Sequence, residues 1–136
     1  MILDASAAAS FLLPDEAEPG DELLERLTLG PVLVPQHWPL EIISILQNAK
    51  RRRRIDQAGR DRAMSQASSW SVRIDPLTST VAWSESLRLA DEFALTIYDA
   101  AYLELAIRTK DTLASNDKEL VAAARRRGVD VLTSLP

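Results

Sequence analysis

The sequence predicts an α/β domain with a central, mainly parallel sheet, and two observations favour this fold class. Short apolar runs alternate along the chain with longer stretches of helical period, as expected for strands joined by crossover helices. The length of 136 residues suits one domain and is sufficient to bury a core without disulfides. We therefore expect a single domain over residues 1–136.

The elements of the first half follow one another with clear stops. An alanine-rich helix after the opening strand ends at Pro14, and the next helix is stopped by Gly30. The apolar stripe of a third helix leaves Glu41 at the edge of its buried face. The expected elements are a strand at 1–3, helices at 5–13 and 22–29, a strand at 31–35, and helices at 37–52 and 56–69.

The second half contains the most apolar helical stretch of the chain. This stretch, "IYDAAYLELAIRT" at residues 97–109, is apolar on nearly all sides and is expected to be buried. Gly128 lies just past the end of the last helix. The expected elements are a strand at 71–75, helices at 78–94 and 97–109, a strand at 111–115, a helix at 116–127 and a strand at 129–133.

The residue types present exclude several kinds of chemistry. Cysteine is absent and His37 is the single histidine, which rules out disulfides, a thiol nucleophile and a Cys/His zinc site. No Gly-x-Ser-x-Gly elbow accompanies His37, and we interpret it as structural. Four glycines build neither a Gly-x-Gly-x-x-Gly nor a Walker loop. Catalysis would then depend on carboxylates and a hard metal such as Mg²⁺ or Mn²⁺.

No segment of the sequence predicts a membrane or export role. No apolar tract approaches the roughly eighteen residues of a transmembrane helix. The N-terminal segment lacks basic residues and meets Asp4 early, unlike a signal peptide. We expect a cytoplasmic protein with no membrane partner.

Two segments share one pattern, in which a short apolar run is followed by an acid and then a helix. They are "MILD" before residues 5–13 and "TLASND" before residues 118–124. Because the carboxyl ends of parallel strands line one crevice, Asp4 and Asp117 are expected to be neighbours in space.

Helix capping is the alternative explanation for each acid taken singly. Thr96 and Asp99 resemble a capping box, so capping alone accounts well for Asp99. Asn116 and Glu119 make a capping pair of their own, which leaves Asp117 as a surplus acid.

The combination of acids is more informative than any one of them. Carboxylates gathered at element ends repel one another unless a divalent cation neutralises them. Hydrated Mg²⁺ suits such a cluster, and metal-assisted phosphodiester hydrolysis is the natural chemistry. The candidate catalytic residues are Asp4, Glu41, Asp99 and Asp117.

A basic run, "KRRRR" at residues 50–54, suggests a local phosphate-binding surface in a chain whose net charge is −4. The alternative is a solvated helix end, where cations suit the helix dipole. The candidate RNA-binding residues are Lys50, Arg51, Arg52, Arg53 and Arg54.

Four segments in order resemble the PIN domain, in particular the VapC-type toxins of prokaryotic toxin–antitoxin pairs. They are "MILDASAAASFLL", "PLEIISIL", "LTIYDAAYLELA" and "TLASNDKELVAAARRRGVDVL". The resemblance implies a three-layer α/β/α fold and an endoribonuclease that uses Mg²⁺ or Mn²⁺ to hydrolyse RNA. It also implies a homodimer and a cognate antitoxin protein as partner.

The resemblance assigns roles to individual residues of this sequence. Asp4 and Asp99 match the family's primary metal ligands. Glu41 and Asp117 match positions that complete the metal shell or position water, and Asp117 is also counted as a metal ligand. Ser6 and Ser115 match positions that support the pocket.

Two other function classes stay open. A phosphotransfer protein would need Asp-x-Asp or a paired acid after the first strand, whereas Ser6 stands two residues past a lone Asp4. A non-catalytic PIN-like module that binds RNA or a protein is compatible with the same residues.

Overall fold

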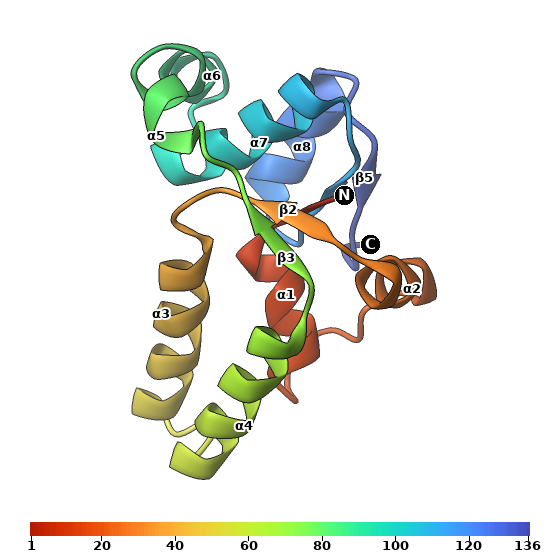
Figure 1. Cartoon of the computed structure of the whole chain (residues 1–136), viewed down its shortest axis with the longest axis vertical. Coiled ribbons are helices and arrows are strands. Elements are labelled where there is room, and N and C mark those ends of the chain that lie inside the picture. Colours follow the sequence, from red (N-terminus) through yellow and green to blue (C-terminus); the bar gives the residue numbers. More distant parts are fainter.

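The computed structural model describes all of residues 1–136 and shows an α/β fold around a five-stranded sheet (Figure 1). Every paired strand is parallel, and the strand order is β3–β2–β1–β4–β5. The strands are β1 (Ile2–Leu3), β2 (Val32–Val34), β3 (Val72–Ile74), β4 (Leu113–Ala114) and β5 (Val131–Leu132). The predicted fold class is confirmed, although each strand is shorter than its apolar run.

The strand order reverses next to β1, and this reversal positions the candidate site. The chain moves from β1 outward to β2 and β3, then returns to the other side of β1 for β4 and β5. Ile2 pairs with Leu113 and Leu3 with Ala114, so both strands end at the same level. In open parallel sheets such a reversal opens a crevice at the carboxyl ends of the strands. Asp4 and Ser115 therefore leave the sheet side by side.

Helices cover both faces of the sheet and make the three layers (Figure 1). On one side α1 (Ala5–Leu12), α3 (Trp38–Arg51) and α4 (Gln57–Ser69) pack against one another. On the other side α7 (Ile97–Thr109) packs on β1, β4 and α8 (Lys118–Arg126). A further helix, α2 (Asp21–Leu29), precedes β2 and ends at Gly30, whose positive φ of 36° suits glycine. No helix is long and apolar enough to cross a membrane.

The core lies between the sheet and these helices, and small side chains allow close approach on the α1 side. Three alanines of α1 are at most 1 % exposed, and they are Ala5, Ala7 and Ala8. On the opposite face, residues 100–106 of α7 are all buried. The two central strands, β1 and β4, are fully buried. The turns that carry the candidate acids are thus mounted on the most buried part of the molecule.

Two predicted helices differ from their expected form. The stretch at 78–94 is not one α-helix: α5 (Thr78–Val81) is followed by a π-helical turn, η1 (Ala82–Ser86), and then by α6 (Leu87–Phe93). A π turn adds one residue to a helical turn, which a periodicity of 3.6 does not reveal. The helix at 97–109 is buried as predicted over residues 100–106. Its last residue, Thr109, is exposed, and so is its first turn, where Tyr98 is 59 % exposed. That exposed turn borders the candidate site.

Candidate functional site

Asp4 directly follows β1 and is the most buried of the candidate acids, with 3 % of its surface exposed. It stands at the N-cap position of α1, yet its side chain makes no capping hydrogen bond. Instead, Oδ2 accepts hydrogen bonds from Ser6 Oγ at 2.5 Å and from Ser115 Oγ at 2.7 Å. Capping therefore does not explain this acid.

The other hydrogen bonds of Ser6 and Ser115 leave the hydrogen of each hydroxyl available to donate to Asp4. Ser6 Oγ accepts from the backbone N–H of Asn116 at 2.9 Å, and Ser115 Oγ accepts from that of Asp117 at 3.1 Å. Because a backbone N–H can only donate, the hydroxyl hydrogens are free to point at Asp4. These contacts join the β1–α1 turn to the β4–α8 turn. Both serines that the sequence associates with the pocket thus contact its central acid.

Burial raises the pKa of Asp4 from 3.8 to about 6. The hydrogen bonds from Ser115 and Ser6 oppose this rise, whereas the charges of Glu41 and Asp99 add to it. A carboxylate at this position is therefore costly to ionise, and neighbouring acids make it costlier.

Asp99 lies half-buried in the first turn of α7. Burial raises its pKa, and the charges of Asp117, Glu41 and Glu119 raise it further. Thr96 caps the helix as expected, because its Oγ1 accepts from the Asp99 backbone N–H at 3.1 Å. A hydrogen bond from the Thr96 side chain also opposes the rise in the pKa of the Asp99 carboxyl, but it does not cancel that rise.

Glu41 lies against two side chains that the sequence did not connect with the site, and one of them, Tyr102, hydrogen-bonds it. Tyr102 donates its hydroxyl to Glu41 Oε1 at 2.7 Å, and His37 Nε2 lies 3.1 Å from the same oxygen. Burial raises the pKa of Tyr102, as do the charges of Asp4 and Glu41, so its hydroxyl stays protonated and able to donate. A signal was available, because Tyr102 lies three residues after Asp99 and His37 four before Glu41 on their helices.

The structure corrects the expected capping of α8. The cap is Asp117 itself, whose Oδ1 accepts from the Leu120 backbone N–H at 2.8 Å. The predicted Asn116–Glu119 pair is wrong, because Asn116 Oδ1 instead accepts from the Ser134 backbone N–H at 2.8 Å. The Asn116 side chain thus binds the C-terminal segment and does not cap α8. Asp117 has a structural role of its own beside any functional one.

The donor set fits a hard divalent cation in chemistry. Three of the four acids keep one carboxylate oxygen that accepts no hydrogen bond: Oδ1 of Asp4, Oε2 of Glu41 and Oδ2 of Asp117. Asp99 hydrogen-bonds no side chain other than that of Thr96. Such oxygens are the ligands that Mg²⁺ and Mn²⁺ prefer. In this arrangement no three side chains drawn from the acids and the histidine lie close enough together to hold a metal ion. Cation binding would require these side chains to draw together.

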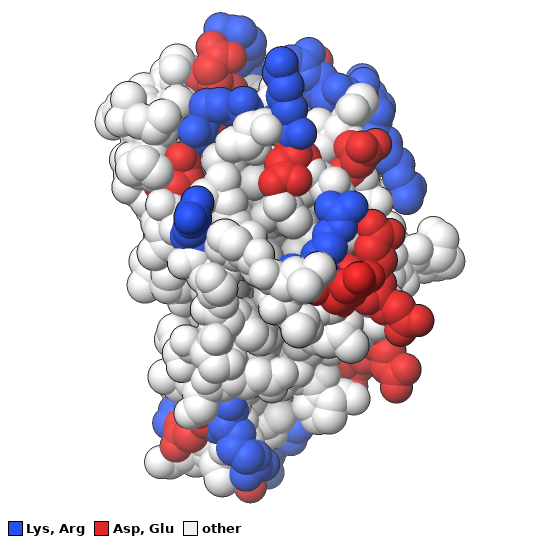
Figure 2. Space-filling model, turned by 45° about the vertical axis from the view of Figure 1, so that its right-hand side comes forward, with Lys and Arg blue, Asp and Glu red and all other residues white.

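The basic run lies at the far end of α3, and the structure divides its members. Arg54 is paired at 2.7 Å with Asp15 and at 2.8 Å with Glu16, so its charge is neutralised locally. Lys50 and the three arginines at 51–53 form no ion pair, and Figure 2 shows basic side chains gathered at this lower end of the molecule. Arg52 and Arg54 also line an open cleft of about 330 Å³ that reaches Ser6 and Asn116. The expected RNA contacts of this run remain a prediction.

Comparison with known proteins places the fold among known relatives. A family model described as the PIN domain matches residues 1–126. Among solved structures, the chain is similar to the crystal structure of PAE2754 from Pyrobaculum aerophilum, with a TM-score of 0.69 and 24 % sequence identity over 96 % of this chain and 87 % of that one. No curated protein gives a significant match. At this identity the structural likeness supports the fold alone.

Proposed function

Because the chain belongs to the PIN domain family, whose members are typically nucleases, we propose that it is a metal-dependent endoribonuclease. The proposed catalytic set is Asp4, Glu41, Asp99 and Asp117. One observation carries the proposal above the others: a buried carboxylate at the central strand end caps no helix, and two other acids raise its pKa. An arrangement this unfavourable for the folded chain alone is expected where the acids serve a ligand.

The proposed ligand is Mg²⁺ or Mn²⁺. Asp4 and Asp99 would be its primary protein ligands, with Asp117 as a further ligand and Glu41 completing the shell or positioning water. When bound, such a cation supplies an activated water and stabilises the charge that builds on a phosphoryl group. A cation would also relieve the repulsion that raises the pKa values of Asp4 and Asp99.

The remaining side chains hold these acids in place. Ser6 and Ser115 fix one oxygen of Asp4, which leaves its other oxygen as the one available to a ligand. Tyr102 fixes one oxygen of Glu41 in the same way. Because all three hydroxyls are mounted on buried elements, the carboxylates are oriented before a substrate arrives.

The finer proposal is that the chain is the toxin of a toxin–antitoxin pair, as its four motif segments in order suggest. A homodimer, a cognate antitoxin and an RNA substrate are parts of this proposal. Expression of the wild-type chain is then expected to arrest growth, and Asp4→Ala to relieve the arrest. Arrest by Asp4→Ala at an equal protein level would contradict the assignment.

RNA cleavage by the purified protein tests the enzymatic proposal. Wild type with Mn²⁺ is expected to cut an RNA pool, a chelator to stop it, and Asp99→Asn to abolish it. Asp91→Asn is the matched control, because Asp91 is exposed on α6 and forms no ion pair. Cleavage retained by Asp99→Asn would refute the role of this acid.

A second candidate function is a PIN-like module that binds RNA without cutting it. The observation in its favour is that no three acids are grouped tightly enough to hold a metal ion. This candidate predicts RNA binding by wild type that is unchanged by Mn²⁺ and by Asp99→Asn, with no cleavage. Metal-dependent cleavage excludes it.

A further inference from the structure

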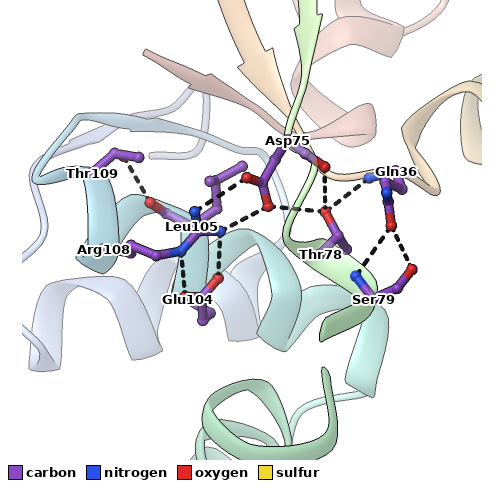
Figure 3. A network of polar contacts seen from close by, with 8 residues as sticks. All are labelled: Gln36, Asp75, Thr78, Ser79, Glu104, Leu105, Arg108 and Thr109. Carbon is purple, nitrogen blue, oxygen red and sulfur yellow. Dashed lines mark hydrogen bonds and ion pairs between the residues drawn. The ribbon is translucent and has the colours of Figure 1, made fainter. Parts of the chain in front are cut away.

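A buried polar network joins α7 to the loop after β2, and its purpose is not explained by the four acids (Figure 3). Arg108 donates to Glu104 Oε1 at 2.7 Å and to both oxygens of Asp75, the nearer at 2.7 Å. Glu104 and Asp75 are at most 5 % exposed. Thr78 Oγ1 donates to Asp75 Oδ2 at 3.1 Å and accepts from the Gln36 backbone N–H at 3.1 Å. The network therefore ends at Gln36.

The side chain of Gln36 has one defined orientation. The backbone N–H of Ser79 lies 3.1 Å from Gln36 Oε1, and the Ser79 hydroxyl bonds the same oxygen (Figure 3). Because a backbone N–H can only donate, its partner must be the amide oxygen and not the nitrogen. Both lone pairs of Oε1 are thereby occupied. The amide nitrogen makes no hydrogen bond within the protein, so Gln36 presents two free donors and no acceptor.

Gln36 lines a cleft that adjoins the acidic site. The cleft holds about 200 Å³, and its lining includes the Gln36–Ser79 pair and the exposed first turn of α7 with Ile97 and Tyr98. His37 also lines it, and the same ring lies 3.1 Å from Glu41. The cleft and the acids thus share His37 as a common wall.

An aromatic face is available in this cleft. Tyr98 is 59 % exposed, and its ring packs against His37 in a T-shaped arrangement with a centroid distance of 5.4 Å and an interplanar angle of 62°. Single-stranded RNA is commonly recognised by stacking a base on such a ring and reading its edge with hydrogen bonds. An amide donor beside an exposed aromatic ring therefore provides the two groups that a base-binding subsite needs.

We propose that this cleft binds the base of a nucleotide next to the cut bond, with Tyr98 stacking on it and Gln36 reading its edge. The inference rests on the proposed ribonuclease function. Because Gln36 offers donors alone, the subsite favours edges rich in acceptors, namely N7 and O6 of guanine or O4 of uracil. Adenine and cytosine present an amino donor there and are disfavoured. The buried network of Figure 3 fixes the backbone of Gln36 through Thr78, and Ser79, the next residue after Thr78, orients the Gln36 amide.

Exchanging the donors for an acceptor gives the sharpest test. In Gln36→Glu one carboxylate oxygen still accepts from Ser79, while the other replaces the amide nitrogen. We expect the cleavage sites in a random RNA pool, mapped by sequencing, to shift from guanine and uracil toward adenine and cytosine by about tenfold. Gln66→Glu on exposed α4 controls for the added charge. Tyr98→Ala is expected to weaken RNA binding about tenfold without changing base preference, and Tyr98→Phe to restore it.

Failure of this inference is distinguishable from failure of the proposed function. If wild type cleaves RNA but Gln36→Glu gives the same base preference, the subsite is refuted while the ribonuclease stands; a protein partner in the cleft would give this result. If wild type cleaves nothing, metal-free binding of labelled oligo-uridine and oligo-adenosine decides. A uridine preference that Gln36→Glu reverses supports the subsite, and equal binding of both by wild type overturns it.

Discussion

Replacing Asp4 by asparagine is expected to make the metal-free protein more stable at neutral pH. Folding raises the pKa of Asp4 from 3.8 to about 6, because the site is buried and faces other acids. The folded state therefore binds the Asp4 proton more tightly than the unfolded chain does. As the pH rises through this window the folded state loses stability, and above about 6 the loss is complete.

The full effect corresponds to about 3 kcal/mol, of which about 2 kcal/mol falls between pH 4.5 and 7.5. Asparagine does not titrate, and its amide oxygen still accepts from Ser6 and Ser115. The difference in free energy of unfolding between Asp4→Asn and wild type is thus expected to grow by about 2 kcal/mol over this range. Comparing the two proteins at each pH removes the contributions of all other titrating groups.

Urea denaturation at a series of pH values, with a chelator present, measures this difference. The control is Asp91→Asn, which changes an exposed acid and is expected to run parallel to wild type. Parallel curves for Asp4→Asn and wild type would show that Asp4 titrates normally. The description of Asp4 as a carboxylate kept ionised at a cost would then be wrong.

Three further outcomes are expected. Arg108→Met leaves Asp75 and Glu104 buried without a cation, and should lower the free energy of unfolding by about 3–5 kcal/mol in urea denaturation; Arg88→Met, which breaks an exposed pair, should cost less than about 1 kcal/mol. Asp117→Ser keeps a helix cap, so it should retain the stability of wild type while losing RNA cleavage. Asp117→Ala should lose RNA cleavage and also about 1 kcal/mol of the free energy of unfolding. Equal cleavage by wild type, Asp117→Ser and Asp117→Ala would show that this acid only caps the helix. Mn²⁺ at about a hundred times its dissociation constant should raise the free energy of unfolding of wild type by about 2.7 kcal/mol, as seen in thermal or urea unfolding; no rise would argue against a cation site.

One acid at a strand end shows what distinguishes a structural carboxylate from a candidate ligand. Asp75 follows β3 and is as buried as Asp4, with 4 % exposed. Burial would raise its pKa, but the hydrogen bonds and charge of Arg108 hold that pKa below its usual value. Asp4 has no cation beside it, and its pKa is raised. Position at a strand end alone does not identify the site, whereas the missing partner charge does.

The strands and most of the α-helices were predictable because each leaves a local signal. Two-residue strands such as β1 and β4 are short, yet apolar runs between helical stretches mark them. The π-helical turn left no signal, because one additional residue in a turn hardly changes the pattern of apolar residues. The helix cap at Asp117 was misassigned for a similar reason. Adjacent Asn116 and Asp117 can each cap, and the choice depends on a distant contact of Asn116 with Ser134.

Contacts between distant segments explain the rest of what the sequence did not show. Tyr102 meets Glu41 across 61 positions, and Arg54 meets Asp15 across 39. Neither pairing has a local pattern, since the first depends on how α3 and α7 are placed and the second joins the turns that follow α1 and α3. The nearness of the turns that carry Asp4 and Asp117 was foreseeable, because parallel strands end at one edge of the sheet. Ser6 and Ser115, which donate to Asp4, were both expected from the family resemblance, whereas Tyr102, which donates to Glu41, was not.

Calorimetric titration of Mn²⁺ into the purified protein tests most directly whether the four acids form one cation site. Wild type is expected to bind Mn²⁺ saturably, with proton release below about pH 6 as Asp4 ionises. Asp4→Asn and Asp99→Asn are expected to lose this binding, and Asp91→Asn to keep it. Absence of saturable binding to wild type, or equal binding by all four proteins, would contradict the proposed metal pocket.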